Sequence, residues 1–270
     1  MSDLSYKIES SIKMLNFYND RFNPYHVAFS GGRDSSVLLW LVKKAKVDFN
    51  AFFYDNCLIH LKDRNHIKNV YPDVKILMSN WNLKKLVEIH KMLPTRWRGY
   101  CCAFFKESHN CNGIVLTGIR SEECFKRKQR YVFEFSRNSI FKFYKGIINP
   151  IKGFSNEDIK VILDSEKIPL SETYEKKSRN GCIGCPMQAN VFHDLYDINP
   201  EYRIIWIKAV EVAWKFADKK KFLSAHDLFQ WWLSGLPFSY YKFFRERNVL
   251  PVTIDNLYAN SYQIHEKKFY

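Results

Sequence analysis

The stretch "HVAFSGGRDSSVLLWLVKKA", residues 26–45, decides the fold of this chain. The apolar run "HVAF" predicts a strand, two glycines predict a turn, and "SSVLLWLVKKA" has the apolar spacing of a helix. Gly31 and Gly32 can take backbone angles closed to other residues, so a ligand can approach the main chain. The start of a helix points free N–H groups and its positive dipole end at such a turn. Three hydroxyl groups flank it, those of Ser30, Ser35 and Ser36.

These features predict an anion site, and phosphate is the anion that suits it best. Arg33 and Asp34 follow the glycines directly. Asp34 would repel a bare phosphate, so its presence favours a Mg²⁺ ion that bridges it to the phosphates. The turn lacks the Lys-Ser or Lys-Thr that ends a Walker loop. A plain strand–turn–helix corner with an N-cap is the alternative. We expect Asp34 at the surface of the turn.

Strand and helix patterns alternate after this corner. The further predicted strands are "DFNAFFYD" (48–55), "VKILMS" (74–79) and "GIVLTGI" (113–119), and predicted helices cover 61–71 and 83–93. This alternation predicts an α/β fold, a parallel twisted, Rossmann-like sheet with helices on both faces. Ligands bind such sheets beyond the carboxyl ends of the strands. Three side chains besides the turn are expected there, those of Asp55, Met78 and Arg120.

The chain changes character after Pro186. Downstream stretches such as "YRIIWIKAVEVAWKFADKK" are helical in pattern and rich in aromatic residues. We therefore expect a nucleotide-binding domain over residues 1–186 and a helical C-terminal extension over 187–270. Within the first domain, Ser155 is expected to cap a helix together with Asp158, three residues on.

The bulk composition limits the class of protein. The 270 residues are 46% hydrophobic, enough for a substantial core. No run approaches the roughly 20 uncharged apolar residues of a membrane span, and "MSDLSYKIESSIKM" lacks the apolar region of a signal peptide. We expect a cytoplasmic protein with no membrane partner. The net charge of +14 favours a polyanionic partner such as DNA or tRNA; a basic surface that aids solubility is the alternative.

Four of the seven cysteines form two close pairs, Cys101–Cys102 and Cys182–Cys185. A Cys-x-x-Cys loop with glycines lets two thiolates face one metal centre, and a second pair can complete four ligands. Adjacent cysteines need a strained or helical backbone and a bulky target if both are to bind. This favours an iron–sulfur cluster over structural zinc, a redox dithiol or plain reduced thiols. The isolated Cys57, Cys111 and Cys124 are expected to be structural.

Two basic stretches are candidates for anion binding. "GIRSEECFKRKQR" (118–130) contains Arg120, whose forked guanidinium can hold a phosphate with two hydrogen bonds. Its other cations are equally consistent with a solvated loop. "TRWRGY" (95–100) mixes cations with aromatic rings. That mixture suits a single-stranded or flipped nucleotide, with simple packing as the alternative.

In this order, the motifs resemble the phosphoadenosine phosphosulfate reductase family, within the adenine nucleotide α-hydrolase (PP-loop) superfamily, from about residue 26 to 190. The segments that resemble the family are "SGGRDS", "FFYDN", "RGYCCAFFK", "TGIRSEECFKR", "INPIKGFSNEDI" and "RNGCIGCPM". Cys124 stands where the family motif has a serine. The resemblance implies a 4Fe-4S cluster on Cys101, Cys102, Cys182 and Cys185. It implies that Lys106 lies between the cluster and the nucleotide. It also implies adenine nucleotide, ATP with Mg²⁺, bound by residues 30–36, Asp55, Met78, Gly118 and Arg120.

Two departures of this sequence from the family pattern indicate which subfamily it resembles. Sulfonucleotide reductases of this fold use a cysteine in a C-terminal tail, and "NSYQIHEKKFY" (260–270) has none. "SGGRDS" is also similar to the loop of ATP pyrophosphatases. Both points favour adenylation of a nucleic acid, which then receives sulfur. A cysteine desulfurase is a possible sulfur donor. The expected catalytic residues are Ser30, Asp34, Lys106 and Arg120. The nearest analogues in function are the enzymes of DNA phosphorothioation and tRNA thiolation. The alternatives are a reductase of phosphoadenosine or adenosine phosphosulfate whose thiol comes from Cys57 or a partner, and a non-catalytic nucleotide-binding regulatory protein.

Overall fold

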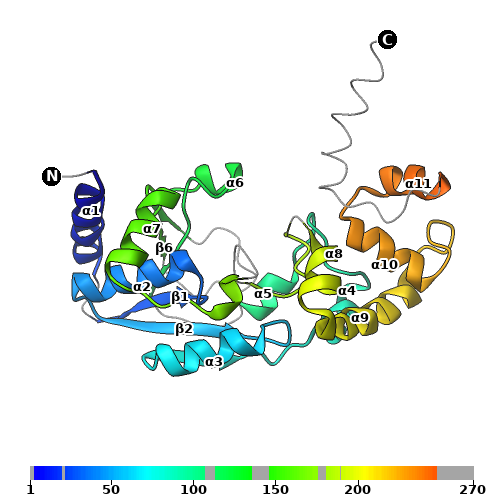
Figure 1. Cartoon of the computed structure of the whole chain (residues 1–270), viewed down its shortest axis with the longest axis horizontal. Coiled ribbons are helices and arrows are strands. Elements are labelled where there is room, and N and C mark those ends of the chain that lie inside the picture. Colours follow the sequence, from blue (N-terminus) through cyan, green and yellow to red (C-terminus); the bar gives the residue numbers. More distant parts are fainter. Residues whose placement is uncertain are drawn as a thin grey trace, which may run out of the picture. The chain divides into compact units, whose positions relative to one another are not determined.

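The chain packs as two compact units in the computed structural model, shown in Figure 1. The first unit comprises residues 1–79 and 105–181, and the second comprises 80–104 and 182–270. The structure describes residues 3–19, 22–106, 113–135, 146–175, 181–188 and 190–247. Cys111 and the tail at 260–270 lie outside these described residues. The domain boundary expected at residue 186 stays a prediction.

A six-stranded sheet organises the first unit, in the order β3-β2-β1-β4-β6-β5. Its strands are β1 (Tyr25–Phe29), β2 (Phe49–Asp55), β3 (Val74–Met78), β4 (Ile114–Leu116), β5 (Phe133–Glu134) and β6 (Gly146–Ile148). All neighbouring pairs are parallel except β5 with β6, which are antiparallel. The α/β fold with a largely parallel sheet is thereby confirmed. Strands β5 and β6 are too short and too interrupted for periodicity to indicate them.

The corner between β1 and α2 (Arg33–Ala45) forms for the reasons that the sequence suggests. Strand β1 is buried along almost its whole length. Helix α2 buries Val37, Leu41 and Ala45, which recur every fourth residue and so share one face. Gly31 between them has φ +72°. An added Cβ there would lie 2.9 Å from Ile67 Cδ1, so this position requires glycine.

Further helices complete the first unit. They are α1 (Asp3–Phe17), α3 (Leu61–Val70), α6 (Phe125–Lys128), α7 (Asn156–Ser165) and the 3₁₀ turn η1 (Glu172–Glu175). Helix α2 packs against α1 and α7, which flank it in Figure 1. The expected cap of α7 is confirmed as a capping box: Ser155 Oγ accepts from Asp158 N, and Asp158 accepts from Ser155 N. Helix α5 (Cys101–Phe105) lies at the boundary between the two units in the sequence.

The second unit is helical over its described residues, which confirms the helical character expected after Pro186. Its elements are α4 (Leu83–His90), α8 (Val191–His193), the π-helical turn η2 (Asp194–Ile198), the 3₁₀ turn η3 (Pro200–Tyr202), α9 (Arg203–Phe216), α10 (Ala225–Ser234) and α11 (Phe238–Glu246). Helix α9 packs against α4 and α10. Helix α4 ends at His90 rather than at the predicted residue 93, because Lys91 takes the left-handed conformation with φ +57°.

No helix among the described residues combines the length and the apolar character that crossing a bilayer requires.

Candidate functional site

The turn after β1 is tied together by its own hydroxyl groups. Ser30 Oγ and Ser35 Oγ are 3.0 Å apart, and Ser35 Oγ donates to the Gly32 carbonyl at 2.9 Å. The Gly32 N–H points at Ser30 Oγ at 3.4 Å. Ser36, in contrast, is buried and within hydrogen-bond distance of the Tyr71 hydroxyl. Two of the three predicted hydroxyls therefore shape the loop, and the third packs behind it.

Tyr174 covers the start of helix α2. The hydroxyl of this η1 residue accepts a hydrogen bond from the Arg33 N–H at 3.0 Å, although 141 residues separate the two in sequence. An added Cβ at Gly32 would lie 3.2 Å from the same hydroxyl. Sequence reasoning missed Tyr174, because no local pattern near residue 174 indicates a partner for the turn. A phosphate that binds this helix start meets Tyr174 as a neighbour.

Arg120 holds Asp34 in place. The guanidinium is only 4% exposed, and its Nε donates to Asp34 Oδ1 at 2.7 Å. Its other nitrogens donate to Asn156 Oδ1 at 2.8 Å and to the Phe154 carbonyl at 3.3 Å. Arg120 is therefore fixed from three sides, and sequence reasoning missed the contributions of Phe154 and Asn156.

Asp34 is less exposed than expected. It belongs to the first turn of α2 rather than to the surface of the turn, and its side chain is 28% exposed. Burial raises the pKa of this carboxyl, while the charge of Arg120 lowers it; the effect of burial is the larger. The folded protein thus keeps a partly desolvated carboxylate at the glycine turn. Arg120 already gives it one cationic partner, and a carboxylate oxygen in such a place can also bind Mg²⁺.

A polar cavity of about 420 Å³ opens at this point. It lies beyond the carboxyl ends of β1 and β4, where the strand order reverses, and such switch points bind ligands in α/β sheets. Its volume is within the range of small-molecule sites. Gly118 lets the two loops meet, because an added Cβ there would lie 3.1 Å from the Asp34 carbonyl carbon. The predicted residues that line it are Ser30, Gly32, Arg33, Asp34, Ser35, Gly118 and Arg120.

Asp55 and Met78 lie at the carboxyl edge as expected but do not line this cavity. Asp55 ends β2, is fully buried and accepts a hydrogen bond from Arg64 Nη2 at 2.8 Å. Met78 ends β3 and is 63% exposed. Their assignment to nucleotide binding stays a prediction. The same holds for Lys106, an exposed residue directly after α5.

The cations after Arg120 are partly neutralised. Arg127 pairs with Glu123, and Arg130 pairs with Glu134 at 2.6 Å. Cys124 is exposed and precedes helix α6, which carries Lys126, Arg127 and Lys128 in its last turn. A cavity wall that contains Glu122, Glu123 and Arg127 is thus mixed in charge.

Cys101 interacts electrostatically with the three other paired cysteines, Cys102, Cys182 and Cys185. Cys101 and Cys102 begin helix α5, so the helical alternative for adjacent cysteines is the one found. The pKa of the Cys101 thiol is raised, first by its hydrogen bond with Cys102, then by burial, and further by the charges of Cys102, Cys182 and Cys185. Within the described part of the chain, no three Cys, His, Asp or Glu side chains converge closely enough to enclose a single metal ion.

The Cys182–Cys185 loop is held by the helices that follow it. Gly184 has φ +69°, and its N–H donates to the buried Asp194 Oδ2 at 2.7 Å. An added Cβ would lie 2.3 Å from Trp206 Nε1, which donates to the Ile183 carbonyl at 3.1 Å. Asp194 and Trp206 were not predicted from the sequence. The only local signal is the glycine between the cysteines.

Comparison with known proteins places this arrangement among relatives. A sequence profile of the family described as phosphoadenosine phosphosulfate reductase domain matches residues 24–189. An uncharacterized protein of Methanocaldococcus jannaschii is 28% identical over 232 residues, which are 81% of this chain and 46% of that protein. The chain therefore spans about half the length of the curated relative that it matches.

Three solved structures resemble parts of the chain at low identity. A phosphoadenylyl-sulfate reductase from Candida auris in a phosphate complex has a TM-score of 0.46 and 17% identity, over 67% of this chain and 96% of its own. The U34-tRNA thiolase NcsA from Methanococcus maripaludis with its [4Fe-4S] cluster has a TM-score of 0.42 and 14% identity, over 75% and 80%. The FMN adenylyltransferase of Candida glabrata has a TM-score of 0.48 and 14% identity, over 67% and 62%.

Proposed function

This chain belongs to the phosphoadenosine phosphosulfate reductase domain family, and we propose that it is an iron–sulfur ATP pyrophosphatase. Its substrate is a nucleic acid, which it adenylates so that sulfur can replace the activated oxygen. One observation carries the nucleotide part of the proposal: a half-buried carboxylate, Asp34, is fixed by Arg120 at the glycine turn that opens helix α2. A carboxylate at an anion site is useful when the anion arrives as its Mg²⁺ complex.

The residues of the cavity have different roles in this reaction. The turn from Ser30 to Ser35 binds the phosphates at the positive end of the dipole of helix α2, next to the Arg33 N–H and its partner Tyr174. Asp34 orients the metal that accompanies ATP, and Arg120 keeps Asp34 in place. An acceptor oxygen then forms a bond to the α-phosphorus. The bond from that phosphorus to the oxygen bridging the α- and β-phosphates breaks, and pyrophosphate leaves with the electron pair.

The four paired thiols of the second unit are the candidate ligands of a cluster. Cys101 interacts electrostatically with the other three, and no group of side chains among the described residues is arranged around a single metal ion. A four-iron cluster is larger and accepts more widely spaced ligands. Cys101, Cys102, Cys182 and Cys185 would hold it, and it would offer iron to which a sulfur atom can bind. A cysteine desulfurase is a suitable class of sulfur donor.

Iron content tests this assignment. Protein purified without oxygen should be brown and contain about four irons per chain, because the two cysteine pairs supply four thiolates. Iron and acid-labile sulfide analysis with the visible absorption spectrum provides the measurement. Replacing Cys124, which is exposed and lies outside the two pairs, by serine should leave the iron content unchanged. One zinc and no iron per wild-type chain would remove the cluster from the account.

Reduction of a sulfonucleotide is the second candidate, and the description of the matched family favours it. That reaction needs a nucleophilic thiol, for which Cys57 is a candidate since it follows β2 by two residues. The anaerobically purified chain should therefore be incubated with phosphoadenosine phosphosulfate and reduced thioredoxin. We expect no sulfite. Sulfite release at an enzymatic rate, lost in Cys57→Ser, would replace the proposed function by the second candidate.

A further inference from the structure

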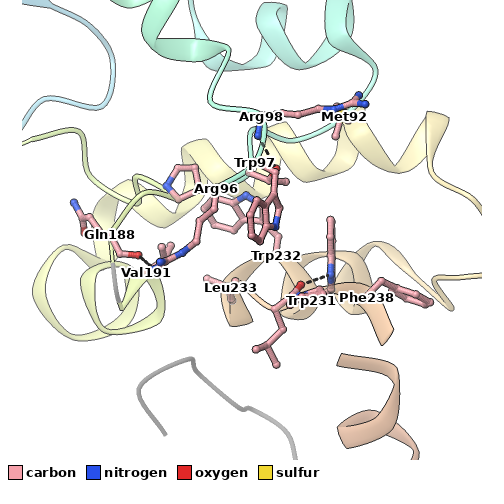
Figure 2. A pocket seen from close by; sticks show the side chains of 15 residues that line it. Met92, Arg96, Trp97, Arg98, Gln188, Val191, Trp231, Trp232, Leu233 and Phe238 are labelled. Carbon is pink, nitrogen blue, oxygen red and sulfur yellow. Dashed lines mark hydrogen bonds between the residues drawn. The ribbon is translucent and has the colours of Figure 1, made fainter. Parts of the chain in front are cut away.

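An aromatic pocket of about 370 Å³ lies in the second unit, beside the Cys182–Cys185 loop. Figure 2 shows Arg96, Trp97 and Arg98 along one side and Trp231, Trp232 and Phe238 along the other. Pro186 and Gln188, which directly follow Cys185, also line it. The pocket is therefore separate from the polar cavity of the first unit, and no step of the proposed reaction uses it.

The walls of this pocket are fixed by hydrogen bonds to the backbone. Trp232 Nε1 donates to the Pro94 carbonyl at 2.7 Å, and Trp231 Nε1 donates to the Leu236 carbonyl at 3.0 Å. Arg96 donates to the Gln188 carbonyl, which ties the pocket to the loop after the cysteines. A preformed cavity costs less conformational entropy on binding than one that must be ordered first.

Trp97 lines the pocket and yet is 79% exposed. An indole that faces solvent at the mouth of an aromatic pocket can stack on a flat ring that enters. Flat apolar walls accept such a ring whatever its edge groups are, because every nucleobase has a π-face. The shape thus favours a base over a branched aliphatic group.

The charge around the pocket favours a polyanion. Residues 80–104 contain five Lys or Arg and a single acidic residue, Glu88. Arg98 is exposed, and the one side-chain contact found for its guanidinium among the described residues is with Met92 Sδ at 3.5 Å. Sulfur is a weak acceptor, so this guanidinium can bind a phosphate at little cost. Aromatic walls with cations at the rim are the combination that binds single-stranded nucleic acid.

We propose that this pocket binds an unpaired base of an RNA substrate, with Arg98 on an adjacent phosphate. The inference rests on the proposed function, since it names RNA as the nucleic acid acceptor. RNA loops present bases that are already unstacked, whereas duplex DNA must first flip a base out. Pro186 and Gln188 place the bound base next to the segment of Cys182 and Cys185.

Binding of a labelled RNA hairpin with a long single-stranded loop tests the proposal. Fluorescence anisotropy is measured on the full chain, purified without oxygen, in the absence of ATP. Trp97→Ala should raise the Kd about tenfold because one stacking partner is lost. Tyr240→Ala is the matched control: this aromatic side chain of α11 is 60% exposed and does not line the pocket. Arg98→Gln should lower the slope of log Kd against log salt by about one.

An abasic scan of the hairpin loop identifies the inserted base. One abasic position should weaken binding to the wild-type chain and have little further effect on Trp97→Ala, because both changes remove the same contact. Equal affinity of Trp97→Ala, Tyr240→Ala and the wild type would overturn the proposal. Equal binding, with the same Trp97 dependence, of a fully paired DNA duplex of that sequence would overturn the choice of RNA. The assay contains no ATP, so a failure of ATP cleavage leaves its result intact and counts against the proposed function alone.

Discussion

Asp34→Asn is expected to abolish Mg²⁺-dependent release of pyrophosphate from ATP while leaving the fold intact. Loss of the carboxylate removes the group that we propose to hold Mg²⁺ at the turn, and we expect at least about a hundredfold loss of rate. The asparagine oxygen can still accept from Arg120 Nε, so the loop keeps its shape. Pyrophosphate release at saturating Mg-ATP and the thermal unfolding midpoint are the two measurements.

Asp34 should make the folded chain less stable as the pH rises, which is the reverse of the usual effect of an ion-paired carboxylate. Burial raises the pKa of Asp34, so its charged form is less favourable in the folded chain than in the unfolded one. Its stabilising contribution is complete below the unfolded-state pKa of about 3.9 and is lost as the pH rises through the folded-state value. Asp34→Asn should therefore gain stability relative to the wild type as the pH rises through that range.

Asp158→Ala is the control: it should cost about 1 kcal/mol through the lost cap of α7 and keep full activity. Wild-type pyrophosphate release by Asp34→Asn would exclude Asp34 from the mechanism.

Gly184→Ala is expected to prevent binding of the proposed cluster and to destabilise the second unit. The left-handed backbone costs an alanine roughly 1–2 kcal/mol. The new methyl group would also lie 2.3 Å from Trp206 Nε1, and overpacking of this kind costs about 1–3 kcal/mol. Trp206 cannot yield easily, because it is fully buried and stacks on Trp232 with ring centroids 4.2 Å apart. We expect a loss of about 2–5 kcal/mol and of most of the bound iron.

Gly181→Ala provides the matched control three residues away. An added Cβ at Gly181 meets no heavy atom within 4 Å. This variant should keep the iron content and the unfolding midpoint of the wild type. Iron per chain and thermal unfolding, measured in parallel on both variants, separate a local effect of the loop from a general effect of losing a glycine. Full iron occupancy in Gly184→Ala would contradict the role assigned to this loop.

Local patterns in the sequence were sufficient to predict the strand–turn–helix corner that carries the proposed nucleotide site. The β1 strand, the glycine turn and helix α2 are encoded within twenty consecutive residues, because burial, backbone freedom and helical spacing all act over that range. The capping box at Ser155 is local for the same reason. The spacing of the Cys-x-x-Cys pair is also a local property, and the assignment of the four cysteines as cluster ligands stays a prediction.

The distant residues that hold the turn after β1 and the Cys182–Cys185 loop in place could not be predicted in this way. Tyr174 reaches Arg33 across 141 residues, and Asn156 reaches Arg120 across 36. Trp206 Nε1 donates to the Ile183 carbonyl across 23 residues. Such contacts depend on how distant elements pack, and no periodicity in a single segment specifies a partner so far along the chain. The shorter end of α4 at Lys91 similarly reflects a left-handed residue that helix propensity does not indicate.

The position at which ATP is cut tests the central claim most directly. The anaerobically purified chain is incubated with Mg²⁺ and ATP labelled at the α-phosphate or, in a parallel reaction, at the γ-phosphate, together with the RNA hairpin. We predict that the α-label appears in AMP or in adenylated RNA and that the γ-label appears in pyrophosphate, with both signals lost in Asp34→Asn. Label in ADP and inorganic phosphate, or unchanged ATP in a chain that carries its full complement of iron, would contradict the assignment of this chain as an ATP pyrophosphatase.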